Sequence, residues 1–220
     1  MRFPGRSQDQ RDMRVQAWAG QALRFMGVEL CIRGTPPASG PLLIVANHVS
    51  WLDIVVLHAA RHCRFVSKDD VRGWPLVGTL ATGAGTLYVK RSSSRDAMRV
   101  VHHMAQALKD GDILAVFPEG TTGDGTVLLP FHANLLQSAI TAHAPVLPVA
   151  LCYTEGRLRQ PSRAVRYVGD VSLVGSLWRT VGAQRLRAHV SFGEQQEAGA
   201  RDRRTWAHDL RSEIERLRQP

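Results

Sequence analysis

Short apolar runs that alternate along the chain with amphipathic helical segments are the feature that most constrains the fold. Each run has the length and composition of a buried strand. The predicted strands cover residues 28–32, 42–46, 64–67, 86–89, 113–117, 146–152, 165–168 and 186–192, and the predicted helices cover residues 11–28, 94–108, 130–144 and 201–217. Strands that alternate with helices predict an α/β fold, a single layered domain with a mixed, largely parallel sheet flanked by helices. A chain of 220 residues is long enough to close one such core.

The chain is strongly basic, with a formal net charge of +9, and all but three of its 28 basic residues are arginine. Such a charge predicts attraction to an anionic partner, either nucleic acid or an acidic lipid surface, unless the arginines only solvate an ordinary surface. The cysteines are odd in number and lie far apart, at Cys31, Cys63 and Cys152, mostly within apolar runs. They are therefore predicted to be free thiols in a reducing compartment.

The N-terminal segment bears on how the chain meets a membrane. No stretch reaches the ~20 apolar residues that a spanning helix needs, and no apolar signal-peptide core is present, so the chain is expected to be neither membrane-spanning nor secreted. Residues 1–27 are interpreted as an amphipathic helix on the membrane surface, followed by the main domain at 28–220. The apolar stripe of this helix consists of Val15, Trp18, Ala22, Phe25 and Met26. The alternative, equally open, is a helix that caps the core.

Polar residues directly follow the predicted strand at 42–46, and the carboxyl ends of strands are where sites form in α/β sheets. In this set His48 stands five positions before Asp53. A histidine can take a proton from a hydroxyl while a carboxylate fixes its tautomer and stabilises the imidazolium. The pairing requires His48 on the turn before a helix, with Asp53 pointing back from its first turn or two. A helix N-terminal cap is the alternative for the same residues.

Two further polar sets follow strands. Residues 117–122, of sequence Phe-Pro-Glu-Gly-Thr-Thr, have the composition of a loop that presents polar groups. Gly120 would let backbone N–H groups approach a ligand, and the hydroxyls of Thr121 and Thr122 add donors, although a tight turn is the alternative. Residues 85–91 end a strand with the cations Lys90 and Arg91, which can hold a phosphate.

Together these sets resemble the motifs of the glycerolipid acyltransferase family. The run from His48 to Asp53 is similar to the family's first motif, a histidine, four residues and an aspartate, and Asn47 before it agrees. The family's second motif is similar to residues 85–91, its third to residues 117–121 and its fourth to residues 146–149. The family's segment between the first two motifs is similar to residues 65–68 and 74–78. Order and approximate spacing agree from residue 28 to residue 154, the motif-bearing core. Each motif is modest by itself, but four in order are specific.

The resemblance implies an O-acyltransferase that works without an acyl-enzyme. His48, oriented by Asp53, would deprotonate the hydroxyl of a lysolipid acceptor, which then attacks the thioester of acyl-CoA or acyl carrier protein. Arg91 would hold the anionic head group of the acceptor. The other substrate-binding candidates are Lys68, Glu119, Gly120, Thr121 and Thr122. The resemblance implies neither a metal nor an organic cofactor, and it implies a peripheral enzyme on the anionic cytoplasmic face of a membrane.

Two acceptors stay open. The commoner acceptor in the family is 1-acylglycerol-3-phosphate, which gives phosphatidate, and the presence of Arg91 favours it. The family's third motif usually ends in arginine, however, and this chain has Thr122 there. Thr121 and Thr122, with residues 129–132, resemble the branch that includes lyso-ornithine-lipid acyltransferases. A lyso-aminolipid such as lyso-ornithine lipid is therefore the alternative acceptor.

Other classes of protein fit the sequence less well. A serine hydrolase would need Gly-x-Ser-x-Gly, which is absent. His58 and His62 have helical spacing, but no adjacent glutamate completes a zinc-protease motif, and no metal site is predicted. A basic nucleic-acid-binding module is the alternative from another class. The helix at 201–217 mixes acidic with basic residues and no binding motif is visible, so no nucleic-acid partner is predicted.

Overall fold

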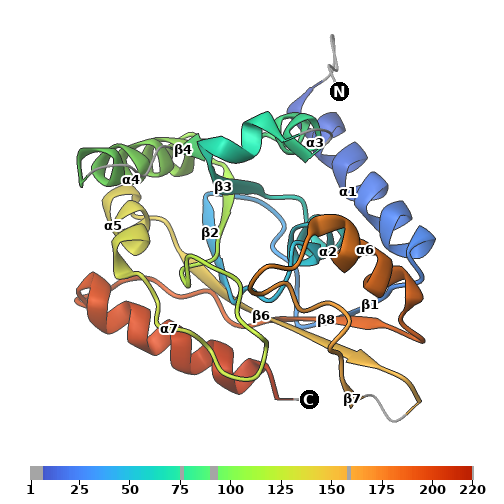
Figure 1. The fold of residues 1–220 in the computed structure, drawn as a ribbon. Helices are drawn as coiled ribbons and strands as arrows, with labels where there is room; N and C mark the ends of the chain where they lie inside the picture. Colours follow the sequence, from blue (N-terminus) through green and yellow to red (C-terminus); the bar gives the residue numbers. More distant parts are fainter. Residues whose placement is uncertain (1–6, 75–76, 90–93, 158–159, 220) are drawn as a thin grey trace.

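The computed structural model describes residues 7–74, 77–89, 94–157 and 160–219 (Figure 1). These residues form an eight-stranded sheet in the order β1-β8-β6-β2-β5-β3-β4, with β7 paired to β6. The strands are β1 (Glu29–Arg33), β2 (Leu42–Ala46), β3 (Arg64–Lys68), β4 (Leu87–Val89), β5 (Ile113–Val116), β6 (Val146–Glu155), β7 (Gln160–Pro161) and β8 (Arg187–Phe192). Strand β6 is antiparallel to β7 and β8, and the other pairs are parallel. The predicted mixed, largely parallel sheet is confirmed.

Helices flank the sheet on both faces (Figure 1). They are α1 (Gln8–Phe25), α2 (Leu52–Ala60), η1 (Asp69–Gly73), α3 (Val77–Gly83), α4 (Ser94–Lys109), η2 (Ala133–Leu136), α5 (Gln137–Ala142), α6 (Leu173–Gly182) and α7 (Arg203–Leu217). One hydrophobic core includes residues of α1 and α2, and the other includes residues of α4, α5 and α7.

The sequence of strand β2 is apolar at every position, and the place of the strand in the sheet explains why. It lies between β6 and β5, and all five of its residues are buried. Leu42, Ile44 and Ala46 enter the core beneath α1 and α2, whereas Leu43 and Val45 enter the core beneath α4, α5 and α7. A strand covered on both faces must be apolar at every position, which produces the continuous run that the sequence contains.

The prediction of a strand at residues 165–168 is wrong. This segment is a loop whose Val165 is fully buried in the core beneath α1 and α2. The backbone N–H of Tyr167 donates to the carbonyl of Val49 at 3.4 Å instead of joining a ladder. Val165 therefore fills the core from a loop, whereas Val168 is exposed.

The helix predicted at residues 130–144 forms only in part, as η2 and α5. Its start is extended because the backbone N–H of His132 donates to the carbonyl of Pro118 at 2.8 Å. Helix α6 was not predicted. The C-terminal helix forms as predicted, beginning after Asp202, whose carboxylate accepts the backbone N–H groups of the first turn.

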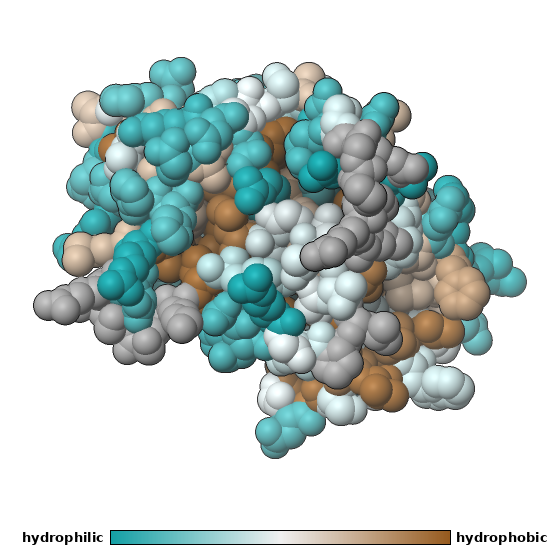
Figure 2. All heavy atoms as spheres, turned by 90° about the horizontal axis from the view of Figure 1, so that it is seen from above, coloured by the Kyte–Doolittle hydropathy of each residue, from teal (hydrophilic) through white to brown (hydrophobic). Residues whose placement is uncertain are grey.

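Helix α1 packs on α2 and caps one core. Its buried residues are Val15, Ala19 and Leu23. The side chain of Gln16 donates to the carbonyls at the end of α2, and Phe25 is almost fully exposed. The inward face thus matches the core-capping interpretation, and a membrane role for the outward face stays a prediction. Among the described helices none is both long and apolar enough to cross a membrane. Seen from above, the surface mixes hydrophilic side chains with hydrophobic ones that reach solvent (Figure 2).

Candidate active site

His48 and Asp53 are in contact at the carboxyl end of β2. The Nδ1 atom of His48 lies 2.8 Å from Oδ2 of Asp53. Asp53 is fully buried in the first turn of α2, and His48 lies on the preceding turn, partly exposed. Because an ionised carboxylate only accepts hydrogen bonds, Nδ1 carries the proton and Nε2 is the basic nitrogen. No described residue hydrogen-bonds Nε2, so it is available to a substrate.

The carboxylate of Asp53 is held by three further donors. Its Oδ2 accepts the backbone N–H groups of Val49 at 2.6 Å and Ser50 at 2.9 Å, and its Oδ1 accepts the hydroxyl of Tyr153 at 2.6 Å. Tyr153 lies on β6 and is buried. Burial, with the nearby charge of Asp53, raises the pKa of Tyr153, so its hydroxyl stays a donor. Sequence reasoning missed Tyr153, which lies one residue beyond the strand predicted at 146–152.

Asn47 fixes the turn that carries His48. Its buried side chain donates from Nδ2 to the carbonyl of Leu151 at 2.9 Å and accepts the N–H of Leu151 at Oδ1, at 2.7 Å. The last backbone pair of β2 and β6 is Ala46 with Val149. The amide of Asn47 therefore continues this pairing where the backbone turns away, and it ties the turn to the strand that carries Tyr153.

The imidazole of His48 stacks on Phe117. The two ring centroids are 3.9 Å apart and the planes differ by 7°. Phe65 stacks on Phe117 from β3, at 5.7 Å. The stack holds the plane of the imidazole, and the hydrogen bond to Asp53 decides which ring nitrogen faces the carboxylate.

Glu119 is buried beneath the same turn. Its Oε1 accepts the backbone N–H of His48 at 2.7 Å, and its Oε2 accepts the N–H of Leu129 at 2.9 Å. Burial raises the pKa of Glu119, although both hydrogen bonds act in the opposite direction. Both oxygens are thus engaged by backbone, and the carboxylate links the third polar set to His48.

The rest of the loop at 117–122 divides into exposed and anchored residues. Gly120 and Thr121 are exposed, and Gly120 has a positive φ of 72°, which favours glycine. The hydroxyl of Thr122 donates to the carbonyl of Tyr167. Thr122 therefore anchors the loop that precedes α6.

The two predicted cations are less fully placed. Lys68 is exposed at the end of β3, at the same edge of the sheet as the end of β5. Arg91 lies outside the described residues. Val89, the last residue of β4, pairs in register with Lys68.

His58 and His62 are buried and bonded to each other, with Nδ1 atoms 3.2 Å apart. The Nε2 atom of His62 meets Asp12 of α1 at 3.1 Å. Burial lowers the pKa of His58 to about 3. The pair thus links α1 to α2, and the described residues contain no cluster of three or more side chains suited to a metal ion.

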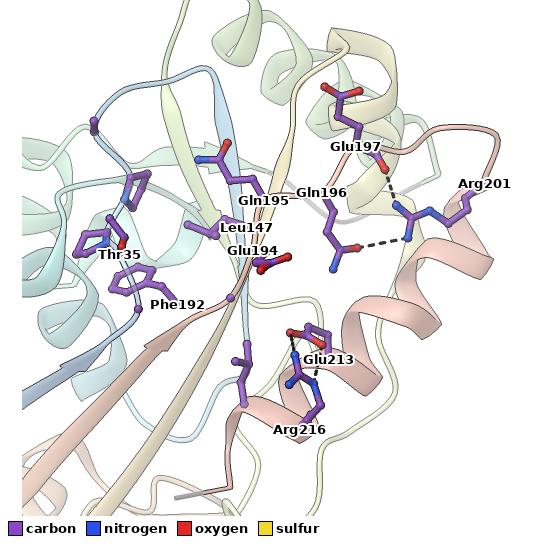
Figure 3. A pocket seen from close by; sticks show the side chains of 16 residues that line it. Thr35, Leu147, Phe192, Glu194, Gln195, Gln196, Glu197, Arg201, Glu213 and Arg216 are labelled. Atoms are coloured by element: carbon purple, nitrogen blue, oxygen red, sulfur yellow. Dashed lines mark hydrogen bonds and ion pairs between the residues drawn. The ribbon is translucent and has the colours of Figure 1, made fainter.

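A hollow lies at the opposite edge of the sheet, where β8 ends and β6 begins (Figure 3). Its lining includes Phe192, Leu147 and Glu194, and its charged groups partly pair with one another, as Arg216 does with Glu213 at 2.6 Å. It contains none of the predicted site residues.

The geometry around His48 defines a class of site. A buried, fully hydrogen-bonded carboxylate orients a histidine whose second nitrogen is open, at the carboxyl edge of an α/β sheet. Such a pair acts as a general base on a hydroxyl.

Comparison with known proteins then gives the family. The sequence model described as Acyltransferase matches residues 28–152, more than half of the chain. The chain belongs to this family and is an acyltransferase.

Named relatives fall into two groups. A lyso-ornithine lipid O-acyltransferase of Pseudomonas aeruginosa is 36% identical over 197 residues, 90% of this chain and 75% of the relative. A 1-acyl-sn-glycerol-3-phosphate acyltransferase of Neisseria gonorrhoeae is 38% identical over 186 residues, 83% of this chain and 71% of the relative. The crystal structure of a 1-acyl-sn-glycerophosphate acyltransferase from Thermotoga maritima has the same fold, with a TM-score of 0.70 at 19% identity, over 99% of this chain and 86% of that one.

Proposed function

We propose that this chain transfers a fatty-acyl group from acyl-CoA or acyl carrier protein to the free hydroxyl of 1-acylglycerol-3-phosphate, which gives phosphatidate. The observation that carries the proposal is the buried carboxylate of Asp53 on Nδ1 of His48, with Nε2 open. Relatives whose names state this activity support it.

In the proposed reaction Nε2 of His48 takes the proton of the acceptor hydroxyl as its oxygen attacks the thioester carbonyl. The C–O bond forms, the tetrahedral intermediate collapses, and the C–S bond breaks. The thiolate leaves with the proton that His48 carried. Asp53 stabilises the imidazolium in between, and no acyl-enzyme forms.

The binding residues are proposed on the same basis. The exposed Gly120 and Thr121 border the acceptor, and the cations Lys68 and Arg91 hold its phosphate. Glu119 contributes by positioning His48, because its oxygens already bond backbone N–H groups. The enzyme works peripherally on the cytoplasmic face of the membrane, where its positive charge meets anionic lipid.

A second acceptor, lyso-ornithine lipid, is favoured by a separate observation. Thr122 supplies no charge, and its hydroxyl is bonded to the backbone of Tyr167. Relatives named as lyso-ornithine lipid O-acyltransferases match at 33% to 37% identity.

The test offers purified protein labelled acyl-CoA or acyl carrier protein with a panel of lysolipids, with His48→Ala as control. Phosphatidate formed only by the wild type supports the proposal. Product from lyso-ornithine lipid alone would replace it with the second candidate, and no product from any lysolipid would overturn both.

Position 122 separates the two acceptors further. With a phosphate acceptor, Thr122→Arg should lower the acceptor KM or leave it unchanged, because it adds a cation. With an aminolipid it should raise the KM. Thr122→Val is the matched control, since it removes the bond to Tyr167 without adding charge.

A further inference from the structure

Helix α6 carries its apolar side chains outward. The exposed fractions are 77% for Val174, 41% for Leu177, 81% for Trp178 and 51% for Val181. Their spacing places them on one face of the helix. A valine and a tryptophan exposed to this degree, side by side on one helix, indicate a surface that something apolar covers.

The inward face of α6 is small and polar. Ser176 and Thr180 are fully buried, and the hydroxyl of Thr180 donates to the carbonyl of Ser176 at 2.9 Å. The hydroxyl of Ser176 accepts the indole N–H of Trp51 at 3.0 Å. The helix is thus reversed relative to an ordinary surface helix, which buries its apolar face. Hydrogen bonds hold its polar face in place and leave the apolar face free for a partner.

The position of α6 ties this face to the active site. Trp51, which bonds Ser176, lies between His48 and Asp53 in the chain. The loop before α6 is fastened to the same region, because Tyr167 donates to Val49 and accepts from Thr122. In Figure 1 α6 lies in the foreground, in front of α2. A surface that covers the outer face of α6 is therefore separated from the segment that holds the catalytic pair by this one helix.

The charge around α6 identifies the partner. Residues 160–187 contain a single acidic residue, Asp170. The exposed basic residues among them are Arg163, Arg179 and Arg185. Apolar side chains flanked by arginines suit a surface with an apolar interior and anionic head groups. A second copy of this chain would instead bring the same arginines together.

We propose that the outer face of α6 docks on an anionic lipid bilayer, with Trp178 and its apolar neighbours inserted at the level of the head groups. The inference rests on the proposed function, in which a lipid acceptor has to pass from a bilayer to His48. Docking through α6 would hold the segment that carries His48 one helix away from the lipid surface.

The first test measures binding of the purified full chain to vesicles of phosphatidylglycerol and phosphatidylcholine by co-sedimentation. Val174→Ser with Trp178→Ser should weaken binding at least about tenfold, because two exposed apolar groups are lost. Met98→Ser with Val127→Ser is the matched control, since those residues are 67% and 65% exposed elsewhere, and it should bind like the wild type. Equal loss in both double variants, or in neither, would overturn the proposal.

The second test does not depend on the folding of a destabilised variant. Brominated acyl chains quench tryptophans that enter the bilayer, so they should quench the wild-type fluorescence. Trp178→Phe should keep the binding and lose the part of that quenching that comes from Trp178. Unchanged quenching in Trp178→Phe would show that α6 stays in water and would overturn the proposal.

Two further outcomes assign the surface differently. Phe25→Ser abolishing vesicle binding while the α6 variant binds normally would move the docking site to α1. A dimer in sedimentation velocity that only the α6 variant dissociates, with vesicle binding intact, would make α6 a contact between copies. Neither binding measurement requires turnover, so a failure of acyl transfer would overturn the proposed function and leave the docking result standing.

Discussion

Replacing Asp53 by asparagine separates the charge of the carboxylate from its geometry. In the wild type, Oδ2 faces three donors: Nδ1–H of His48 and the backbone N–H groups of Val49 and Ser50. An amide NH2 at the Oδ2 position would face two backbone N–H groups, which are also donors and cannot accept a hydrogen bond. The amide oxygen must therefore take the Oδ2 position. Its NH2 then faces the hydroxyl of Tyr153, which can rotate to accept.

This orientation fixes the expected size of the effect. The tautomer of His48 is preserved, and the imidazolium loses only its charged partner, which costs about 1.5–3 kcal/mol. The value of kcat for Asp53→Asn should therefore fall by about 10-fold to 150-fold. A reversed amide would stabilise the wrong tautomer, for which a fall of about 10⁴-fold is expected.

The assay measures kcat for acyl transfer alongside thermal unfolding. Asp53→Asn should unfold near the wild-type temperature. Asp53→Ala should unfold much lower, because it leaves three buried donors without an acceptor at about 1–3 kcal/mol each. An unchanged kcat in Asp53→Asn would refute the catalytic pair, and a loss of about 10⁴-fold would refute the argument that the backbone N–H groups orient the amide.

Three further changes test the rest of the site. His48→Ala should abolish acyl transfer with unchanged thermal stability, and a variant that kept about a tenth of wild-type turnover would contradict the general-base role. Tyr153→Phe should lower the free energy of unfolding by about 1–3 kcal/mol, measured in urea, because Oδ1 of Asp53 loses its donor; an unaltered value would show that the bond contributes little. Burial raises the pKa of Glu119 above 4.5, so the folded state binds this proton more tightly than the unfolded chain does. Its contribution to stability should be full below pH 4.5 and be lost as pH rises through the raised pKa, which thermal unfolding against pH would detect as a fall that Glu119→Gln lacks.

Much of the fold follows from local pattern. The fully apolar β2 was predicted with its observed bounds, because burial on both faces leaves a continuous run. The segment at 165–168 is also an apolar run, but it is a loop. The backbone N–H of Tyr167 donates to the carbonyl of Val49, which is distant in sequence. Helix α6 was not predicted, although its apolar residues have the spacing of a helical stripe; the structure turns this stripe toward solvent, whereas the pattern alone would have placed it against a core.

In the candidate site, too, contacts between residues close in sequence could be predicted, and contacts across the fold could not. His48 and Asp53 are close in sequence, and their spacing sufficed to predict the contact. Tyr153 supports Asp53 from β6, directly after the apolar run at 146–152, and only the register of β6 brings it there. The hydroxyl of Thr122 is bonded to the backbone of Tyr167, a contact across 45 residues that the local pattern does not show, and its contact with substrate stays a prediction.

The bonds that hold the catalytic turn span long stretches of chain, 100 residues from Tyr153 to Asp53 and 104 from Asn47 to Leu151. During synthesis the whole histidine–aspartate motif leaves the ribosome well before β6 exists. A nascent chain that ends before Val146 therefore lacks the strand that orders this turn, and Asp53 stays hydrated. Pairings of this separation form late in folding. The reactive histidine is thus expected to acquire its working geometry only when β6 joins the sheet, which keeps the incomplete chain inactive toward the lipids around it.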